Sequence, residues 1–305
     1  MSAQREGAGS PASDRSSPRE GSGSPAPDRS SPREGSGWPA PDRSTSFTIA
    51  QLSDPHCGSP FFVPSLLDRA LVEINQLEPD LVIVSGDLTG EGLRGEYELA
   101  REYLDRIACE RMIVIPGNHD SRNVGYVHFE ELFGERSAEL HRDGVSIVAV
   151  DSTEPDLDHG VIGRGRYPWI EERFASQEAY LRIFVLHHHL LPVPGTGRER
   201  NVVHDAGDTL ECLQRAGVHL VLSGHKHVPY AWRLENLFVV NAGTVSTTRL
   251  RGKTKPCYNV IEASPERVTI FRKYPFHERD AILSFDPRTY EYEKDQSLLG
   301  ETAHG

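Results

Sequence analysis

The 305-residue chain has little cysteine and no long apolar run, and each shortage excludes a class of protein. No apolar stretch approaches the roughly 18 residues needed to span a bilayer. The first residues also lack the charged and apolar regions of a secretory signal. The four cysteines lie far apart and form no Cys-x-x-Cys pair, which excludes a zinc knuckle and a disulfide framework. We therefore expect a cytoplasmic protein with free thiols and no membrane partner.

Several common enzyme motifs are also missing. The sequence contains no Gly-x-Ser-x-Gly and no Gly-x-Gly-x-x-Gly, which argues against a serine hydrolase and a dinucleotide-binding protein. Gly252-Lys253-Thr254 resembles the end of a phosphate-binding loop, but Thr247 stands where that motif requires glycine. No Asn-x-Ser/Thr glycosylation acceptor occurs either, in keeping with an intracellular protein.

Residues 1–46 are almost free of apolar side chains and repeat with a period of 14 residues. Such a segment buries too little apolar surface to offset its ordering entropy, which predicts a disordered tail. Its six arginines balance its six acidic residues, so the net charge of -12 falls on residues 47–305. Because nucleic-acid ligands generally require a basic face, this acidic region favours small phosphoester substrates instead.

From residue 47 onward, short apolar runs alternate with segments of helical spacing. Continuous apolar runs suit strands that are covered on both faces, and these runs are residues 47–52, 81–85, 112–116, 145–150, 183–186 and 218–223. Apolar residues three and four apart predict helices between them, over about 64–77, 97–107 and 210–216. This alternation predicts β-α-β units.

The pattern changes after residue 227. Closer strands without intervening helices are expected at 237–240, 258–261 and 267–271, and they indicate a second sheet packed on the first. Residues 276–305 are charged and weakly periodic. We therefore expect them to be a polar C-terminal extension of a domain that covers residues 47–275.

Five short clusters of metal-ligand side chains occur in a fixed order along this pattern. They are Asp54-Pro55-His56, Gly86-Asp87, Gly117-Asn118-His119-Asp120, His187 and Gly224-His225-Lys226-His227. Four of the five directly follow an apolar run, and ligands of α/β folds bind at the carboxyl ends of strands. We therefore expect all five clusters to reach the same end of a sheet, where they would form the centre of a two-metal hydrolase.

The residue types and their spacing suit divalent transition-metal ions. Asp54 and His56 lie two residues apart in extended backbone, so both side chains project to one side, and His225 and His227 repeat this geometry. The two carboxylate oxygens of Asp87 can bridge two metals, although an aspartate after a strand also commonly caps a helix. Mixed imidazole and carboxylate donors favour Mn, Fe or Zn over Ca.

The third cluster, Gly117-Asn118-His119-Asp120, is the most specific of the five. The Asn118 carbonyl is an oxygen ligand that adds no negative charge, which leaves the site able to attract phosphate. The adjacent His119 could donate a proton to a leaving alkoxide. Asp120 either orients the His119 ring or is an ordinary turn residue.

Three consecutive histidines follow the strand expected at 183–186. Only one of them is needed as a ligand, and we assign His187 because it comes first after the strand. His188 and His189 are interpreted as packing or rim residues.

In their order and spacing, the five clusters resemble the signature of the calcineurin-like metallophosphoesterase superfamily over about residues 47–271. The resemblance implies an α/β fold, a four-layer α/β/β/α sandwich of two mixed β-sheets flanked by helices. It also implies two divalent metal ions with the shared ligand Asp87 between them. One ion would be held by Asp54, His56, Asp87 and His227, and the other by Asp87, Asn118, His187 and His225.

The resemblance further implies that His119 contacts the phosphate and helps the leaving oxygen depart, with Asn118 beside it. Within the superfamily, the chain is most similar to bacterial class III cyclic-nucleotide phosphodiesterases and their glycerophosphodiesterase relatives. The similarity lies in the core length, the Asp151-Ser152-Thr153 and His159-Gly160 spacing, and the histidine-rich segment that leads to two prolines. His159 thereby becomes a candidate substrate-binding residue.

We expect residues 122–130, 154–166 and 190–206 to form the walls above the metals, which decide the preference for monoesters or diesters. Two segments leave the details of these walls open. His189-Leu190-Leu191 departs from relatives in which proline soon follows the metal-binding histidine, and Asn241-Ala242-Gly243-Thr244 resembles a loop near the site or is a plain turn. The expected activity is hydrolysis of small phosphodiesters or phosphomonoesters, 3′,5′-cyclic nucleotides among them, by a hydroxide activated at two metals. The alternatives are a non-catalytic binding protein on the same fold and a nuclease of the same superfamily.

Overall fold

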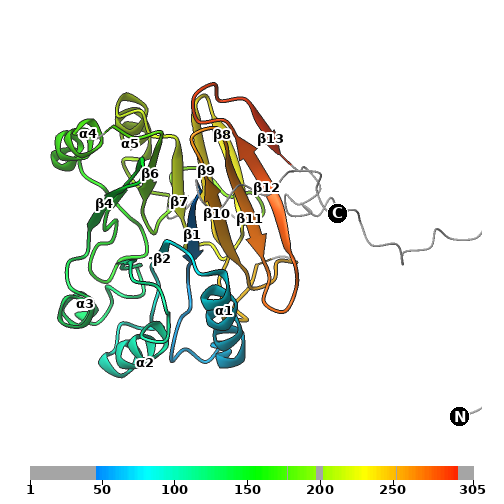
Figure 1. The fold of residues 1–305 in the computed structure, drawn as a ribbon. Helices are drawn as coiled ribbons and strands as arrows, with labels where there is room; N and C mark the ends of the chain where they lie inside the picture. Colours follow the sequence, from blue (N-terminus) through cyan, green and yellow to red (C-terminus); the bar gives the residue numbers. More distant parts are fainter. Residues whose placement is uncertain (1–45, 177, 197–201, 252, 295–305) are drawn as a thin grey trace, which may run out of the picture. The chain divides into compact units, whose positions relative to one another are not determined.

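The computed structural model describes residues 46–176, 178–196, 202–251 and 253–294 (Figure 1). The expectation of a disordered tail therefore falls almost wholly outside the described residues. Two β-sheets form the centre of the described chain, and the helices cover their outer faces. Among the helices of these ranges, none combines the length and the apolar character needed to cross a bilayer.

The first sheet has seven strands in the order β13-β12-β11-β10-β1-β2-β3. Its strands are β1 (Phe47–Leu52), β2 (Leu81–Ser85), β3 (Met112–Ile115), β10 (Tyr258–Ala263), β11 (Val268–Lys273), β12 (Arg279–Phe285) and β13 (Tyr292–Lys294). The strands β1, β2 and β3 are parallel, with α1 (Pro64–Leu77) and α2 (Arg94–Leu104) as crossovers. The remaining four strands run antiparallel to their neighbours.

The second sheet has six strands in the order β4-β5-β6-β7-β9-β8. Its strands are β4 (Ala138–Arg142), β5 (Val145–Ala149), β6 (Leu181–Val185), β7 (Leu220–Ser223), β8 (Tyr230–Leu234) and β9 (Leu237–Asn241). The four central strands are parallel, while β4 and β8 pair antiparallel at the two edges. The crossovers contain a 3-10 turn (Arg164–Arg166), α4 (Tyr167–Ala175) and α5 (Ala206–Arg215).

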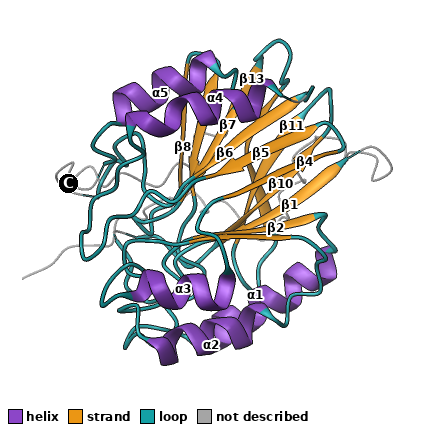
Figure 2. Cartoon of the chain, turned by 90° about the vertical axis from the view of Figure 1, so that its left-hand side faces the viewer, coloured by secondary structure: helices purple, strands orange, loops and turns teal. Residues whose placement is uncertain are grey.

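Three clusters of buried side chains hold these layers together. One lies between the two sheets and includes residues such as Ile49, Ile83, Ile147 and Leu222. A second packs the first sheet against α1, α2 and α3 (Gly125–Phe133), and a third packs the second sheet against α4 and α5. Figure 2 shows α1–α3 on one side of the strands and α4–α5 on the other. The expected four-layer α/β/β/α architecture is confirmed.

Helix α1 illustrates how the sequence produces these elements. Pro64 occupies its first turn, where a missing backbone N–H removes no helical hydrogen bond. One face, with Leu67, Ala70 and Leu71 among its residues, is buried. The helix ends at Glu78, whose φ of 51° is left-handed, just before Pro79. Periodicity and terminal residues therefore predict this helix correctly.

Three expectations about the fold need correction. The strands after residue 227 do not form the second sheet by themselves, because β8 and β9 join β4–β7 while β10–β13 extend the first sheet. The boundary expected at residue 275 is not found, since β12 and β13 pair within that sheet. Strands β4 and β8 and helices α3 and α4 had not been expected. The edge strands β4 and β8 are mostly half-exposed, so they lack the continuous apolar runs that reveal buried strands.

Candidate metal centre

The candidate metal centre lies where the two sheets meet at the carboxyl ends of their parallel strands. From the first sheet, β1, β2 and β3 lead to Asp54 and His56, Asp87, and Asn118. From the second sheet, β6 and β7 lead to His187, His225 and His227. The clusters were expected at one end of a single sheet, and the structure instead divides them between two. Contact between the sheets is direct, because His187 Nδ1 lies 2.8 Å from the Ser85 carbonyl oxygen at the end of β2.

Two groups of side chains bring their ligand atoms together. The ligand atoms within each group lie within 4.8 Å of one another, and the groups are Asp54, His56, Asp87 and His227, and Asp87, His187 and His225. Asp87 belongs to both groups. The Asn118 side-chain oxygen lies 3.2 Å from His187 Nε2 and 2.8 Å from His225 Nδ1, so it adds an oxygen donor to the second group.

The backbone at this centre is held in an unfavourable conformation. Five non-glycine residues of the two groups have left-handed φ angles, at Asp54 (53°), His56 (49°), Asp87 (54°), His225 (73°) and His227 (57°). Each such residue costs on the order of 1–3 kcal/mol and persists only where the surrounding structure imposes it. Because the strain is concentrated in these residues, we infer that the loop conformation serves to place the ligand side chains and does not maximise local stability.

Glycines in the motifs permit the close approach of the ligand loops. A Cβ on Gly86, whose φ is 91°, would stand 2.4 Å from His187 Nδ1. A Cβ on Gly117 would stand 2.2 Å from an Asp87 carboxylate oxygen. Both distances are far below any real contact, so only glycine fits where the loops cross.

Backbone carbonyl oxygens set the orientation of three imidazole rings. Their Nδ1 atoms approach the carbonyl oxygens of Thr89 (His56, 3.2 Å), Ser85 (His187, 2.8 Å) and Arg249 (His227, 2.6 Å). Since a carbonyl oxygen can only accept, each Nδ1 must carry the proton. In the neutral form of each ring, Nε2 is then a bare lone pair, which is how ligand imidazoles are usually prepared.

These bare nitrogens face one another and the nearby carboxylates. His56 Nε2 lies 2.9 Å from His227 Nε2, and His227 Nε2 lies 3.4 Å from an Asp54 carboxylate oxygen. His187 Nε2 lies 3.4 Å from Asp87 Oδ2. Buried acceptors that converge without a proton between them repel, and a cation bound among them removes this repulsion. The side chains present therefore fit divalent metal ions.

The pKa shifts agree with a centre that attracts positive charge. Burial lowers the pKa of His56 to about 3, so its ring is neutral. Burial also disfavours the charged form of His187, but the adjacent Asp87 carboxylate raises the pKa of that imidazole to about 9. The pKa of Asp87 lies well below its ordinary value, since neighbouring imidazoles outweigh the effect of burial. Asp87 is stabilised by the positive charge of a protonated neighbouring imidazole, and a bound cation would supply that positive charge in place of the proton.

His119 stands beside the centre and not among its ligand groups. Its Nδ1 contacts the Gly90 carbonyl oxygen, and its ring meets the His56 ring edge-on at 4.7 Å between centroids. Only 8% of His119 is exposed, and the residue lines the cavity above the centre. Its backbone N–H donates to Asp87 Oδ1 at 2.9 Å, which ties its position to the carboxylate shared by both groups.

Asp120 does not orient the His119 ring, as one reading of the sequence had suggested. Its carboxylate instead accepts the backbone N–H groups of Leu88, Thr89 and Gly117 at 2.8–2.9 Å and the Thr89 hydroxyl at 2.7 Å. Burial, reinforced by the Asp87 carboxylate, raises the pKa of Asp120 to about 6. Asp120 thus joins the loop after β2 to the loop after β3, and it does not line the cavity.

His159 also differs from its expected place. Its Nε2 lies 3.1 Å from a Glu154 carboxylate oxygen, and its ring stacks on His204 at 4.1 Å. It does not line the cavity, whereas the preceding residue, Asp158, does.

His188 and His189, which follow His187 in the chain, are fully buried packing residues, and both rings lie against His225.

The segment Asn241–Thr244 is more than a plain turn. The Thr244 hydroxyl donates to the Asp54 carbonyl oxygen at 2.7 Å, and the Val245 N–H donates to the Ser53 carbonyl oxygen at 3.1 Å. Ser246 Oγ donates to the Pro55 carbonyl oxygen at 3.0 Å. These bonds hold the Asp54–His56 loop from the side of the second sheet.

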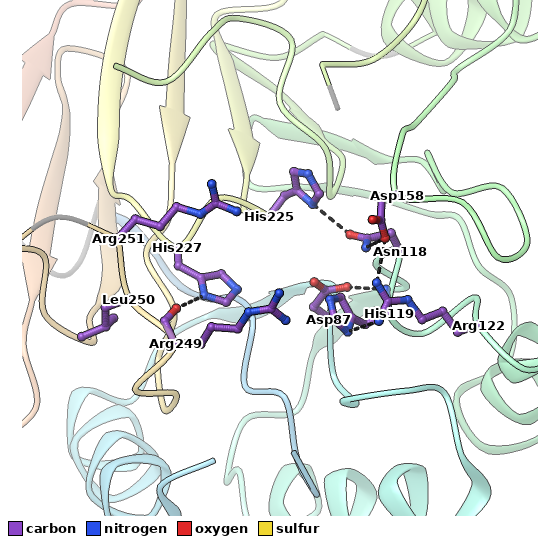
Figure 3. A pocket seen from close by; sticks show the side chains of 10 residues that line it. All are labelled: Asp87, Asn118, His119, Arg122, Asp158, His225, His227, Arg249, Leu250 and Arg251. Atoms are coloured by element: carbon purple, nitrogen blue, oxygen red, sulfur yellow. Dashed lines mark hydrogen bonds and ion pairs between the residues drawn. The ribbon is translucent and has the colours of Figure 1, made fainter. Parts of the chain in front are cut away.

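A cavity of about 270 Å³ opens above the centre (Figure 3). Its walls are formed by Asp87, Asn118, His119, Arg122, Asp158, His225, His227, Arg249, Leu250 and Arg251. Arg122 and Asp158 lie in two of the segments expected to form walls above the metals, residues 122–130 and 154–166. Arg249 and Arg251 had not been identified from the sequence, because their loop has no motif.

Comparison with known proteins agrees with this geometry. A family model described as calcineurin-like phosphoesterase matches residues 47–229. A probable cyclic nucleotide phosphodiesterase from Xenorhabdus bovienii is 28% identical over 207 residues, which cover 63% of this chain and 81% of that protein. A cAMP/cGMP dual specificity phosphodiesterase from Mycobacterium tuberculosis is 27% identical over 171 residues, which cover 53% of each chain.

A solved structure shows the same fold. The purple acid phosphatase from yellow lupin (Lupinus luteus) seeds has a TM-score of 0.62 at 15% identity, over 81% of this chain and 54% of that one. At such low identity the likeness concerns the fold alone. The curated relatives named above therefore carry the information on chemistry, and the chain spans about half of the length of the mycobacterial relative.

Proposed function

The chain belongs to the calcineurin-like phosphoesterase family of phosphoric ester hydrolases, and we propose that it hydrolyses small phosphodiesters with two bound divalent metal ions. The single observation that carries this proposal is the pair of ligand groups that share Asp87. Because curated relatives are named as cyclic nucleotide phosphodiesterases, 3′,5′-cyclic nucleotides are the first natural diesters to test.

The ligands of the two ions follow from the two groups. One ion would be bound by Asp54, His56, Asp87 and His227, and the other by Asp87, Asn118, His187 and His225. Such ions, when bound, stabilise charge on phosphoryl oxygens and lower the pKa of a coordinated water toward neutrality. The mixture of imidazole and oxygen donors favours Mn, Fe or Zn.

His119 is proposed as the residue that serves the leaving oxygen. With its Nδ1 proton directed to the Gly90 carbonyl oxygen, the ring presents Nε2 as its second hydrogen-bonding atom. A protonated Nε2 would donate to the alkoxide oxygen as the ester bond breaks. His119 is outside both ligand groups, so this role needs no change in the ligand set.

Asn118 and Asp120 are proposed to act in different ways. The Asn118 oxygen faces His187 and His225, and its side-chain amide donates to Asp158 at 3.2 Å, which fixes the direction of that oxygen. Asp120 is a positioning residue, because its carboxylate holds the loops that carry Asp87 and Asn118. It is not proposed to transfer a proton.

The proposal is tested with the purified full chain. Metals are removed by chelation, counted by mass spectrometry before and after reloading with Mn²⁺, and rates are compared on three esters. These are bis(p-nitrophenyl) phosphate, p-nitrophenyl phosphate and 3′,5′-cyclic AMP. We expect an inactive chelated protein, about two ions per chain after reloading, and faster turnover of the diesters than of the monoester.

The matched control is His277→Ala, which removes an exposed imidazole that does not line the cavity. Its metal content and rates should equal those of the unchanged chain. Full activity in the chelated protein would refute metal dependence. Exclusive turnover of p-nitrophenyl phosphate would refute the preference for diesters.

A further inference from the structure

The cavity above the candidate metal centre has two cationic sides of different character. Figure 3 shows Arg249 and Arg251 on the His227 side and Arg122 with Asp158 on the opposite side. We use the term arginine wall for Arg249 and Arg251. The wall belongs to the loop between β9 and β10, which supplies none of the proposed metal ligands.

The charge on the Arg122 side is already balanced. Arg122 Nη2 lies 2.7 Å from Asp158 Oδ1, and its Nη1 lies 3.1 Å and 3.2 Å from the two Glu91 carboxylate oxygens. In the described ranges, by contrast, no carboxylate pairs with Arg249 or Arg251. The Arg251 guanidinium donates through Nη1 to the Thr196 carbonyl oxygen at 2.9 Å.

Acidic residues outnumber lysines and arginines in this chain by 45 to 33. Arg249 and Arg251, which have no acidic partner among the residues that the structure describes, stand beside a centre proposed to bind two further cations. Like charges that line one cavity repel, and the repulsion is relieved when an anion enters between them. The wall therefore favours a ligand that carries more negative charge than one reacting phosphate.

The backbone of the wall is held firmly against the centre. The Arg249 carbonyl oxygen accepts the Nδ1 proton of His227 at 2.6 Å, and the Arg249 N–H donates to Thr247 Oγ1 at 3.1 Å. One residue earlier, the Thr248 N–H donates to the Phe61 carbonyl oxygen at 2.9 Å. The Arg249 backbone is therefore fixed relative to His227, a proposed metal ligand. A side chain that extends from a fixed backbone is suited to binding.

The cavity itself limits the substrate. Its volume of about 270 Å³ lies just below the roughly 300–1,000 Å³ of ordinary ligand pockets, which are mostly apolar. Leu250 is the one aliphatic side chain among the ten that line it. A lipid chain finds little apolar surface here, whereas a guanidinium binds phosphate oxygens in a bidentate manner.

We infer that the arginine wall binds a second phosphate group, carried by the part of the substrate that does not react. This inference rests on the proposed phosphodiesterase function and adds that, among small phosphoesters, those with a second phosphate are preferred. The scissile phosphate would lie at Asp87 and His119, and the second phosphate would lie against Arg249 and Arg251. Both arginines are binding residues in this scheme and take no part in bond breaking.

A matched pair of chromogenic diesters tests the inference. The p-nitrophenyl ester of thymidine 5′-phosphate and the same ester with an added 3′-phosphate differ only in the second phosphate. We expect the unchanged chain to show a kcat/KM about tenfold higher for the phosphorylated ester, the gain of one charge-assisted contact. Arg249→Gln and Arg251→Gln should each reduce this ratio, mainly through KM, and Arg249→Lys should keep part of it.

The control variant is Arg288→Gln, which removes one positive charge at an exposed turn where Arg288 pairs with Asp286. It should leave the ratio unchanged, which separates local binding from net charge. Thermal unfolding verifies that all variants are folded. A ratio near one in the unchanged chain, or an equal ratio in the unchanged chain and in Arg249→Gln, would overturn the inference.

Calorimetry distinguishes failure of the inference from failure of the proposed function. Thymidine 3′,5′-bisphosphate and thymidine 5′-phosphate are titrated into the Mn²⁺-loaded chain and into Arg249→Gln. Tighter binding of the bisphosphate that weakens in the variant supports the wall even when no ester is hydrolysed, in which case only the proposed function fails. Equal binding of the two nucleotides overturns the wall whether or not hydrolysis occurs.

Discussion

The candidate metal centre has two halves that differ in chemistry and in the sheet that supplies them. The first-sheet half consists of Asp54, His56, Asp87 and Asn118. The second-sheet half consists of His187, His225 and His227. All carboxylate and amide oxygens of the centre come from the first half, and the second half contributes imidazoles alone. Oxygen donors supply the negative charge that holds a cation, whereas imidazoles favour transition metals over Mg and Ca.

Neither half is sufficient alone. Each proposed ion takes ligands from both sheets, so the centre exists only when the sheets pack together. The negative charge of the centre therefore comes from the unit β1-α1-β2, which carries Asp54 and Asp87. The unit β6-α5-β7 adds the imidazoles that favour transition metals. Variants that remove one contribution at a time can test this division.

The largest effect is expected for Asp87→Asn in the first-sheet half. The substitution removes the carboxylate shared by both groups, so both ions should be lost together. Turnover should fall by more than the roughly 10²–10⁴-fold that a single acid–base group contributes. Metal counting and kcat on bis(p-nitrophenyl) phosphate measure the two effects. Retention of one full ion would show that Asp87 does not bridge.

The next largest effect is expected for two histidines of the second-sheet half, which we assign to different ions. His227→Ala should deplete the ion of the Asp54 group and His225→Ala the ion of the Asn118 group, each with a loss of about 10³-fold in kcat. Spectra of the Co²⁺-loaded variants distinguish the two remaining sites. Identical spectra and metal contents for both variants would contradict the assignment of these histidines to different ions.

His119→Ala should reduce kcat by about 10²-fold or more without altering metal content, because the residue belongs to neither ligand group. The loss should be smaller for esters with good leaving groups such as p-nitrophenolate, which need little help from an acid. Comparison of p-nitrophenyl and methyl esters measures this difference. Loss of both metals in this variant would contradict the role given to His119.

Asp120→Asn tests the support of the first-sheet half. Its buried carboxylate accepts several hydrogen bonds from the two ligand loops, so we expect the free energy of unfolding to fall by about 2 kcal/mol. The matched variant is Asp205→Asn, at the start of α5 in the second-sheet part of the molecule. The half-exposed Asp205 carboxylate accepts the N–H groups of Ile162 and Gly163. Urea denaturation should show a smaller loss there, and equal losses would contradict the idea that burial makes the difference.

The smallest effect concerns a carboxylate outside both halves. Burial disfavours the ionised form of Glu73, but hydrogen bonds from Arg69, the Phe276 N–H and Lys273 lower its pKa below the ordinary value. A depressed pKa contributes stability above the unfolded-state pKa, and this contribution disappears as pH falls through the folded-state pKa. Glu73→Gln should therefore be less stable than the unchanged chain at neutral pH, with the gap closing in acid. Thermal unfolding across pH measures the gap.

Prediction from sequence was most successful where the signal was local and repeated. The predictions of β1, β2 and β5 succeed because these strands are mostly apolar, and that of α1 because periodicity and a proline agree. Prediction failed where packing decides. Strand β12 is buried only in its second half, so its pairing with β11 has no clear pattern in the chain. For this reason the sequence wrongly predicts a polar extension from residue 276 onward.

At the site, the same distinction separates ligands from walls. Each ligand cluster is a short motif after a strand, and the structure brings all of these clusters together. Asp120 and His159 were misplaced because the direction of a side chain depends on neighbouring loops, here the loop from Leu88 to Gly90 and the ring of His204. The arginine wall was missed because arginine in a loop is ordinary until the loop is seen beside the cavity.

By itself, the sequence determined which side chains carry the chemistry and in what order they follow the strands, since motifs and apolar runs are short-range properties. Tertiary structure alone decided that these side chains come from two sheets, that Asp87 stands between two groups, and that Arg249 and Arg251 face them. Those facts depend on contacts between residues more than 100 positions apart, such as His225 with Asp54 and His227 with His56. Such contacts are fixed by burial and packing of whole layers, which no local pattern records.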